Sequence, residues 1–93
     1  MADQSGVYTA DELVMTGAGN VFGLVATVTS AGADGELILY DNTAGSGTKI
    51  FQAVLTGAPL IIFFTDRFSP KFDTGLYAVI PTGISLTLWY RQL

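Results

Sequence analysis

The feature that most restricts the fold of this chain is the length of its apolar runs, which are short and rich in β-branched and aromatic residues. Turn-forming residues separate them at intervals of about 8 to 12 residues, a spacing typical of an all-β sandwich or barrel. The runs cover residues 21–29, 36–40, 48–55, 60–65, 75–80 and 84–91. We therefore predict a small antiparallel β-sandwich or barrel of about six to seven short strands, with an N-terminal arm.

Residues 1–20 differ from this pattern, so we predict an N-terminal arm or short first strand over 1–20 and a β-sandwich domain over 21–93. Thr9 followed three residues later by Glu12 matches a capping box, which would begin one helical turn. The alternative is a short first strand over residues 13–16. The sequence does not choose between these two interpretations.

Two runs allow a prediction of which residues face the core. Residues 58–64 are uniformly apolar but shorter than the roughly 18 residues of a membrane helix, which favours a strand buried on both faces. The last run alternates, because Ile84, Leu86, Leu88 and Tyr90 share one face of an extended strand. Trp89 then lies on the opposite, polar face.

The composition indicates protein partners. Charged residues make up 13% of the chain, against roughly 25% in an ordinary soluble domain. The chain has no Cys, so a domain of this size must draw its stability from packing or oligomerisation, and we expect oligomerisation. The net charge of −4 and the four scattered basic residues predict no nucleic-acid binding, and the short apolar runs predict no membrane span.

Residues 41–47 invite comparison with a phosphate or calcium loop. A phosphate loop requires Gly-Lys-Ser/Thr leading into a helix, whereas Gly47-Thr48-Lys49 has another order and runs into a predicted strand. A calcium loop requires oxygen ligands at alternate positions and a closing Glu, which this segment lacks. We therefore predict a hairpin loop, with no metal and no cofactor.

Asp73-Thr74-Gly75 matches the tripeptide that holds the catalytic carboxylate of aspartic proteases. In those enzymes Ala or Ser usually follows the Gly and the motif lies early in the chain, whereas here Leu76 follows and the motif lies late. The chain also has no His or Cys, which removes the commonest general base and the strongest natural nucleophile. We predict a turn at residues 73–75 and a protein that is not an enzyme.

Three groups of residues are candidates for contact with a protein partner. Residues 66–73 interleave charges with two Phe, as interface hot spots do, although the Phe side chains could instead close one end of the core. An outward Trp89 beside Arg91 could anchor a partner, bind a glycan ring or cover the sheet, and we favour a protein partner. Including two residues of the arm, the predicted partner-binding residues are Arg67, Phe68, Lys71, Phe72, Trp89, Arg91, Leu13 and Met15.

Several turn-and-strand motifs resemble a known family. They are Thr16-Gly17 with Val21-Phe22-Gly23-Leu24, residues 39–49, Phe72-Asp-Thr-Gly75-Leu76-Tyr77, and Pro81-Thr-Gly83. In these motifs the chain is similar to the small β-sandwich virion proteins of tailed bacteriophages, which include capsid decoration (cement) proteins and related head or tail ornaments. The resemblance extends over nearly all of residues 13–91.

The resemblance implies a non-enzymatic structural protein, a homotrimer bound where major capsid protein (coat) subunits meet. Its expected location is the capsid surface of the virion. Because residues 1–8 have neither a basic nor a hydrophobic signal region, we expect synthesis in the host cytoplasm without a signal peptide. The alternative is a tail, fibre or neck domain for assembly or host-glycan recognition, with Trp89 and Tyr90 contacting the sugar.

Overall fold

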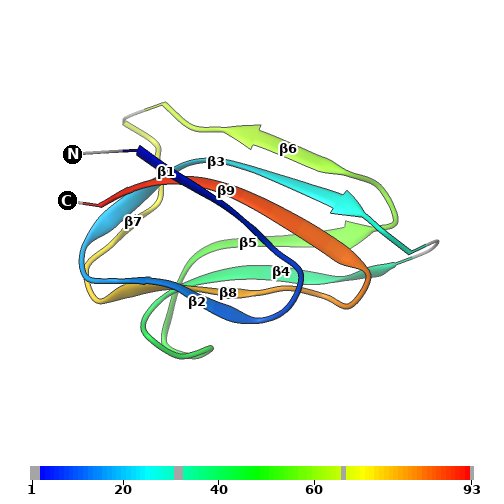
Figure 1. The fold of residues 1–93 in the computed structure, drawn as a ribbon, viewed down its shortest axis with the longest axis horizontal. Helices are drawn as coiled ribbons and strands as arrows, with labels where there is room; N and C mark the ends of the chain where they lie inside the picture. The colour runs from blue at the N-terminus through cyan, green and yellow to red at the C-terminus, as the bar shows by residue number, and fades with distance from the viewer. Residues whose placement is uncertain (1–2, 31–32, 66, 93) are drawn as a thin grey trace.

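The computed structural model of this chain is an all-β sandwich of two antiparallel sheets (Figure 1). It describes residues 3–30, 33–65 and 67–92. Sheet A contains β1 (Asp3–Tyr8), β9 (Ile84–Gln92), β3 (Gly19–Val28) and β6 (Leu60–Phe63) in that order, and β7 (Lys71–Phe72) also pairs with β3. Sheet B contains β2 (Glu12–Thr16), β8 (Gly75–Val79), β4 (Asp34–Asp41) and β5 (Thr48–Thr56). The predicted antiparallel β-sandwich is confirmed, but the described residues form nine strands instead of the predicted six to seven.

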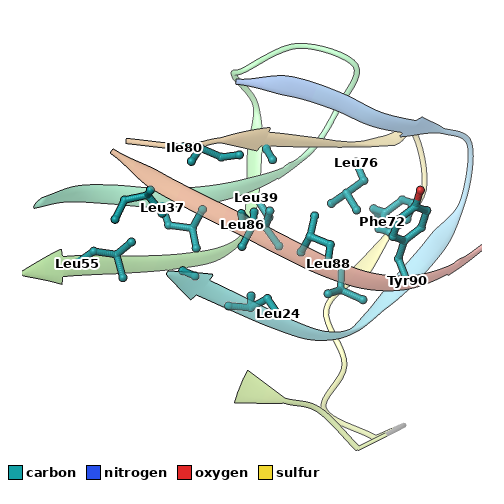
Figure 2. Packing of buried hydrophobic residues seen from close by; sticks show 14 residues of the cluster. Leu24, Leu37, Leu39, Leu55, Phe72, Leu76, Ile80, Leu86, Leu88 and Tyr90 are labelled. Carbon is teal, nitrogen blue, oxygen red and sulfur yellow. The ribbon is translucent and has the colours of Figure 1, made fainter. Parts of the chain in front are cut away.

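The core is a single apolar layer between the two sheets. Side chains alternate along a strand, so the longer strands contribute alternate residues to this layer. In β9 the inward residues include Leu86 and Leu88, which are fully buried, and the predicted inner face of this strand is confirmed. Figure 2 shows Phe72 and Tyr90 together at one end of the layer, with Leu37 and Leu55 at the other.

The N-terminal residues differ from the predicted arm. The backbone of β1 pairs with β9 at the edge of sheet A, and that of β2 pairs with β8 at the edge of sheet B. Residues 3–16 therefore complete both sheets, because each edge strand had backbone groups that a further strand could pair. The predicted short strand over residues 13–16 is confirmed, because these residues lie within β2. The alternative prediction of a helical turn after Thr9 is wrong.

Tyr8 attaches β1 to the core. Its side chain packs against the buried cluster, and its hydroxyl forms a hydrogen bond with Tyr90. Burial, with a smaller contribution from that hydrogen bond, raises the pKa of Tyr8 well above its ordinary value. The first strand is thus part of the packed domain.

The prediction that residues 58–64 form a strand buried on both faces is wrong. β6 lies at the edge of sheet A, and Ile61 and Phe63 are 63% and 67% exposed. Leu60, Ile62 and Phe64 pack against the core. The physical reason is that no described part of the chain forms a third layer over sheet A, so alternate residues of this apolar run face outward.

Leu88 and Val54 allow a test of this core. Leu88 is fully buried on β9, whereas Val54 on β5 is 68% exposed. We expect Leu88→Ala to lower the free energy of unfolding by about 2 to 5 kcal/mol, because it removes buried methyl groups and leaves a cavity. The matched control Val54→Ala should change it by less than about 0.5 kcal/mol. Urea denaturation measures both, and equal effects would contradict this assignment of the core.

Candidate interaction surface

The outward side of sheet A has two rows of side chains that run across four strands. Strand pairing aligns Ser5, Trp89, Gly23 and Phe63 in one row. It aligns Val7, Thr87, Val25 and Ile61 in the next row. Five of these eight residues are large and apolar, so the outward side of sheet A is apolar near its middle.

Gly23 allows the two rings of the first row to meet. Phe63 and Trp89 lie on strands separated by β3, and neighbouring strands are about 4.8 Å apart. Their ring centroids are nevertheless only 5.6 Å apart, at a tilt of 43°. A Cβ atom at position 23 would lie 2.5 Å from Cδ1 of Phe63, so the Phe63 ring occupies the space above Gly23. The pair is within the distance range of favourable aromatic contacts.

These apolar side chains remain accessible to solvent. Val7 is 65% exposed, Trp89 is 36% exposed, and Ile61 and Phe63 have the values given above. An exposed apolar cluster on contiguous strands typically marks an interaction site, whereas single exposed apolar residues do not. We call Val7, Val25, Ile61, Phe63 and Trp89 the outer aromatic face.

Basic side chains lie beside this face. The guanidinium carbon of Arg91 lies 4.6 Å from the ring centroid of Phe22, a cation–π contact. Arg91 and Lys71 pair with the same residue of β3, Asn20, from its two sides. With Arg67 in the β6–β7 loop, three of the four basic residues belong to sheet A or its loops, a grouping that their spacing in the sequence does not reveal.

The structure distributes the predicted partner-binding residues over several surfaces. Trp89 and Arg91 lie on the outward side of β9, and Arg67, Phe68 and Lys71 are exposed in the β6–β7 loop and in β7. Leu13 is 39% exposed but belongs to sheet B, on β2. Met15, on the same strand, is half-buried and packs against the core.

Two hypotheses about these residues need correction. Phe72 is 1% exposed, because it faces the core from β7, so it cannot contact a partner as predicted. The alternative, that a Phe of residues 66–73 closes one end of the core, is confirmed for Phe72. Tyr90 is also buried and cannot form a sugar-binding platform together with Trp89.

Sequence reasoning missed Val7, Val25, Ile61 and Phe63. The missing information is the edge position of β6, since a uniformly apolar run does not show which of its faces is covered. One signal was present: Gly23 interrupts an apolar run, and a glycine within a strand often marks a close approach by another group.

Residues 41–47 form the predicted hairpin loop. β4 and β5 pair antiparallel up to Asp41 and Thr48, which confirms that the loop joins two strands. The Asn42 side chain stabilises the loop, because Nδ2 donates to the Ser46 carbonyl at 2.8 Å and Oδ1 accepts from the Thr43 N–H at 2.8 Å.

Asp41 has a structural role at the Asp-Thr-Gly turn. Its Oδ1 accepts hydrogen bonds from the N–H groups of Thr74 at 2.8 Å, Asp73 at 3.0 Å and Gly75 at 3.5 Å. These hydrogen bonds stabilise the ionised carboxylate and so hold the pKa of Asp41 below its ordinary value. The bond from the Thr74 N–H makes the largest contribution. Asp73 itself is exposed at the turn before β8.

No group of three or more acidic side chains that could hold a metal ion occurs among residues 3–30, 33–65 and 67–92. None of the segments described is an apolar helix of membrane-spanning length. No protein-family model, curated protein or solved structure matches this chain. The exposed apolar side of sheet A is therefore the main indication of function.

The Asp41 hydrogen bonds predict a pH dependence of stability. A carboxyl group whose pKa is lower in the folded than in the unfolded state stabilises the fold at pH values above its unfolded-state pKa. This stabilisation is lost as the pH falls through the folded-state pKa. We expect Asp41→Asn to lower the urea midpoint at neutral pH and to differ little from wild type in strong acid. Asp73→Asn, at the same turn, is the control and should leave the midpoint unchanged. A pH-independent difference between Asp41→Asn and wild type would contradict this role.

Proposed function

We propose that this protein is a non-enzymatic structural component of a bacteriophage virion, a capsid decoration protein that binds and stabilises coat-protein subunits. The observation that supports the proposal best is the outer aromatic face, where four strands of sheet A expose contiguous apolar side chains. The motif resemblance to small virion sandwiches supports the same class. The proposed site of action is the capsid surface, with the protein as a homotrimer.

The chemistry of the face fits a protein partner. Aromatic side chains contribute large contact areas and are enriched in the central part of interfaces, where charged residues are depleted. The Phe63 and Trp89 rings supply such a centre, and their mutual contact restricts their motion before binding. Arg91 lies at the border, where a basic group would favour an acidic rim on the coat protein.

The same face could bind a partner at a tail, fibre or neck position, since its geometry specifies the chemistry of the partner and not the place in the virion. Host-glycan recognition is the weaker alternative, because Tyr90 is buried and leaves Trp89 without its proposed companion.

Binding to coat shells tests the proposal. Coat-protein shells of the phage or prophage whose genome encodes this chain are assembled without it, mixed with purified protein and sedimented. We expect wild type to sediment with the shells up to a saturating stoichiometry. Phe63→Ser should weaken the binding by about tenfold or more, the effect expected for a hot-spot side chain.

Val54→Ser is the matched control, because Val54 is as exposed as Phe63 but lies on sheet B. It should sediment with the shells like wild type. Wild-type protein that stays in the supernatant, or equal losses for the two variants, would contradict the proposal.

A further inference from the structure

A second surface, separate from the outer aromatic face, centres on Phe68 in the β6–β7 loop. Phe68 is 74% exposed, more than any other large apolar side chain described. The backbone on both sides of it is held in place. Its N–H donates to the Thr65 carbonyl at 2.9 Å, and the Pro70 carbonyl accepts from the Val21 N–H at 2.9 Å.

A buried hydrogen bond fixes the residue that follows Phe68. The Asn20 Nδ2 donates to the Ser69 Oγ at 3.0 Å, and both side chains are buried. Residues 68–70 are therefore held by hydrogen bonds before any partner binds. A partner that buries the Phe68 ring would lose little free energy to ordering that backbone.

Basic side chains flank this ring. Arg67 precedes it and Lys71 follows it in β7, and both are exposed. Asp66 lies outside the described residues and is not part of the proposed contact. The Phe68 loop, residues 67–71, thus combines an exposed aromatic ring with two cations, a composition suited to an apolar recess with an acidic rim.

A depression lined by both acidic and apolar residues lies away from this loop. It is an open depression of about 540 Å³, within the size range of ligand sites. Its apolar lining consists mainly of the half-buried Val79 and Pro81, since Ile80, which also lines it, is largely buried in the core. Its carboxylates are those of Asp11, Asp34 and Glu36. We call it the acidic depression.

The two features cannot meet within one copy. The β6–β7 loop lies at the end of the long axis that also holds the chain termini, whereas the β8–β9 turn, beside the depression, lies toward the opposite end (Figure 1). The molecule is 37 Å long in this direction. Any contact between them has to involve two copies.

We infer that the Phe68 loop of one copy binds in the acidic depression of a second copy. Phe68 contacts the apolar lining, and Arg67 and Lys71 face the carboxylates of the rim. The contact joins two different surfaces, so it is heterologous and builds a closed ring or an open chain of copies. This contact goes beyond the proposed coat contact, which uses the outer aromatic face. Experiments can therefore support or contradict the two contacts independently.

Complementary variants of the full chain test this inference by sedimentation velocity, from micromolar to millimolar concentration. Phe68→Asp removes the ring and keeps the depression, whereas Asp34→Lys reverses a rim charge and keeps the loop. We expect wild type to associate and each variant alone to associate about tenfold or more weakly. An equimolar mixture should form a heterodimer, because each variant retains the surface that the other lacks.

Asp11 is left intact, since its Oδ1 accepts a hydrogen bond from the Ile80 N–H at 2.8 Å. Circular dichroism and the melting temperature report whether each variant folds, and Arg67→Glu replaces Phe68→Asp if the latter does not. Ile61→Ser, on the outer aromatic face, is the control and should associate like wild type.

Three results would overturn the inference. The first is a wild-type protein that stays monomeric at millimolar concentration, and the second is a mixture of the two variants that stays monomeric. The third is a loss of association in Ile61→Ser that neither Phe68→Asp nor Asp34→Lys shows. A monomeric wild type whose binding to coat shells is lost in Phe68→Asp would assign the loop to the coat protein instead of a second copy.

Discussion

Two sheets packed face to face enclose only one apolar layer, so each strand can bury only alternate residues. In this chain the layer is filled mainly by aliphatic residues, most of them leucines, together with Phe72 and Tyr90. The residues between them must face outward, whatever their chemistry. Because β1, β3, β6 and β9 have apolar residues at these positions too, sheet A is apolar on both sides. The exposed face is thus a consequence of the sequence of sheet A within a two-layer fold.

The outward sides of the two sheets differ in what covers them. On sheet B the hairpin loop lies against the outward side, since a Cβ atom at Gly45 would be 3.1 Å from the Tyr77 ring and 3.4 Å from the Val79 side chain. On sheet A, Phe63 lies over Gly23 and against Trp89, but both rings remain accessible. The protein thus covers part of one sheet with its own loop, and leaves the other for a partner in the proposed assembly.

The sequence was sufficient to predict what depends on local pattern. Alternation in residues 84–91 correctly placed Leu86 and Leu88 inside and Trp89 outside, and turn chemistry identified the 41–47 loop. It was insufficient where tertiary position decides the outcome. The run that contains Phe63 became an edge strand, Phe72 became part of the core, and residues 3–16 became two strands. Sequence pattern does not specify which strands occupy sheet edges, and the exposure of a side chain depends on which strands lie next to its own.

Trp89 is the only tryptophan of the chain, and it lies in the outer aromatic face, so its fluorescence reports whether a partner covers that face. The most direct measurement is acrylamide quenching of Trp89 in the free protein and in the protein bound to coat shells that lack tryptophan emission in the same window. We predict efficient quenching in the free protein and a strong decrease on binding, because the partner excludes acrylamide. Protein that sediments with the shells while its Trp89 is quenched as before would show that the outer aromatic face is not the docking surface.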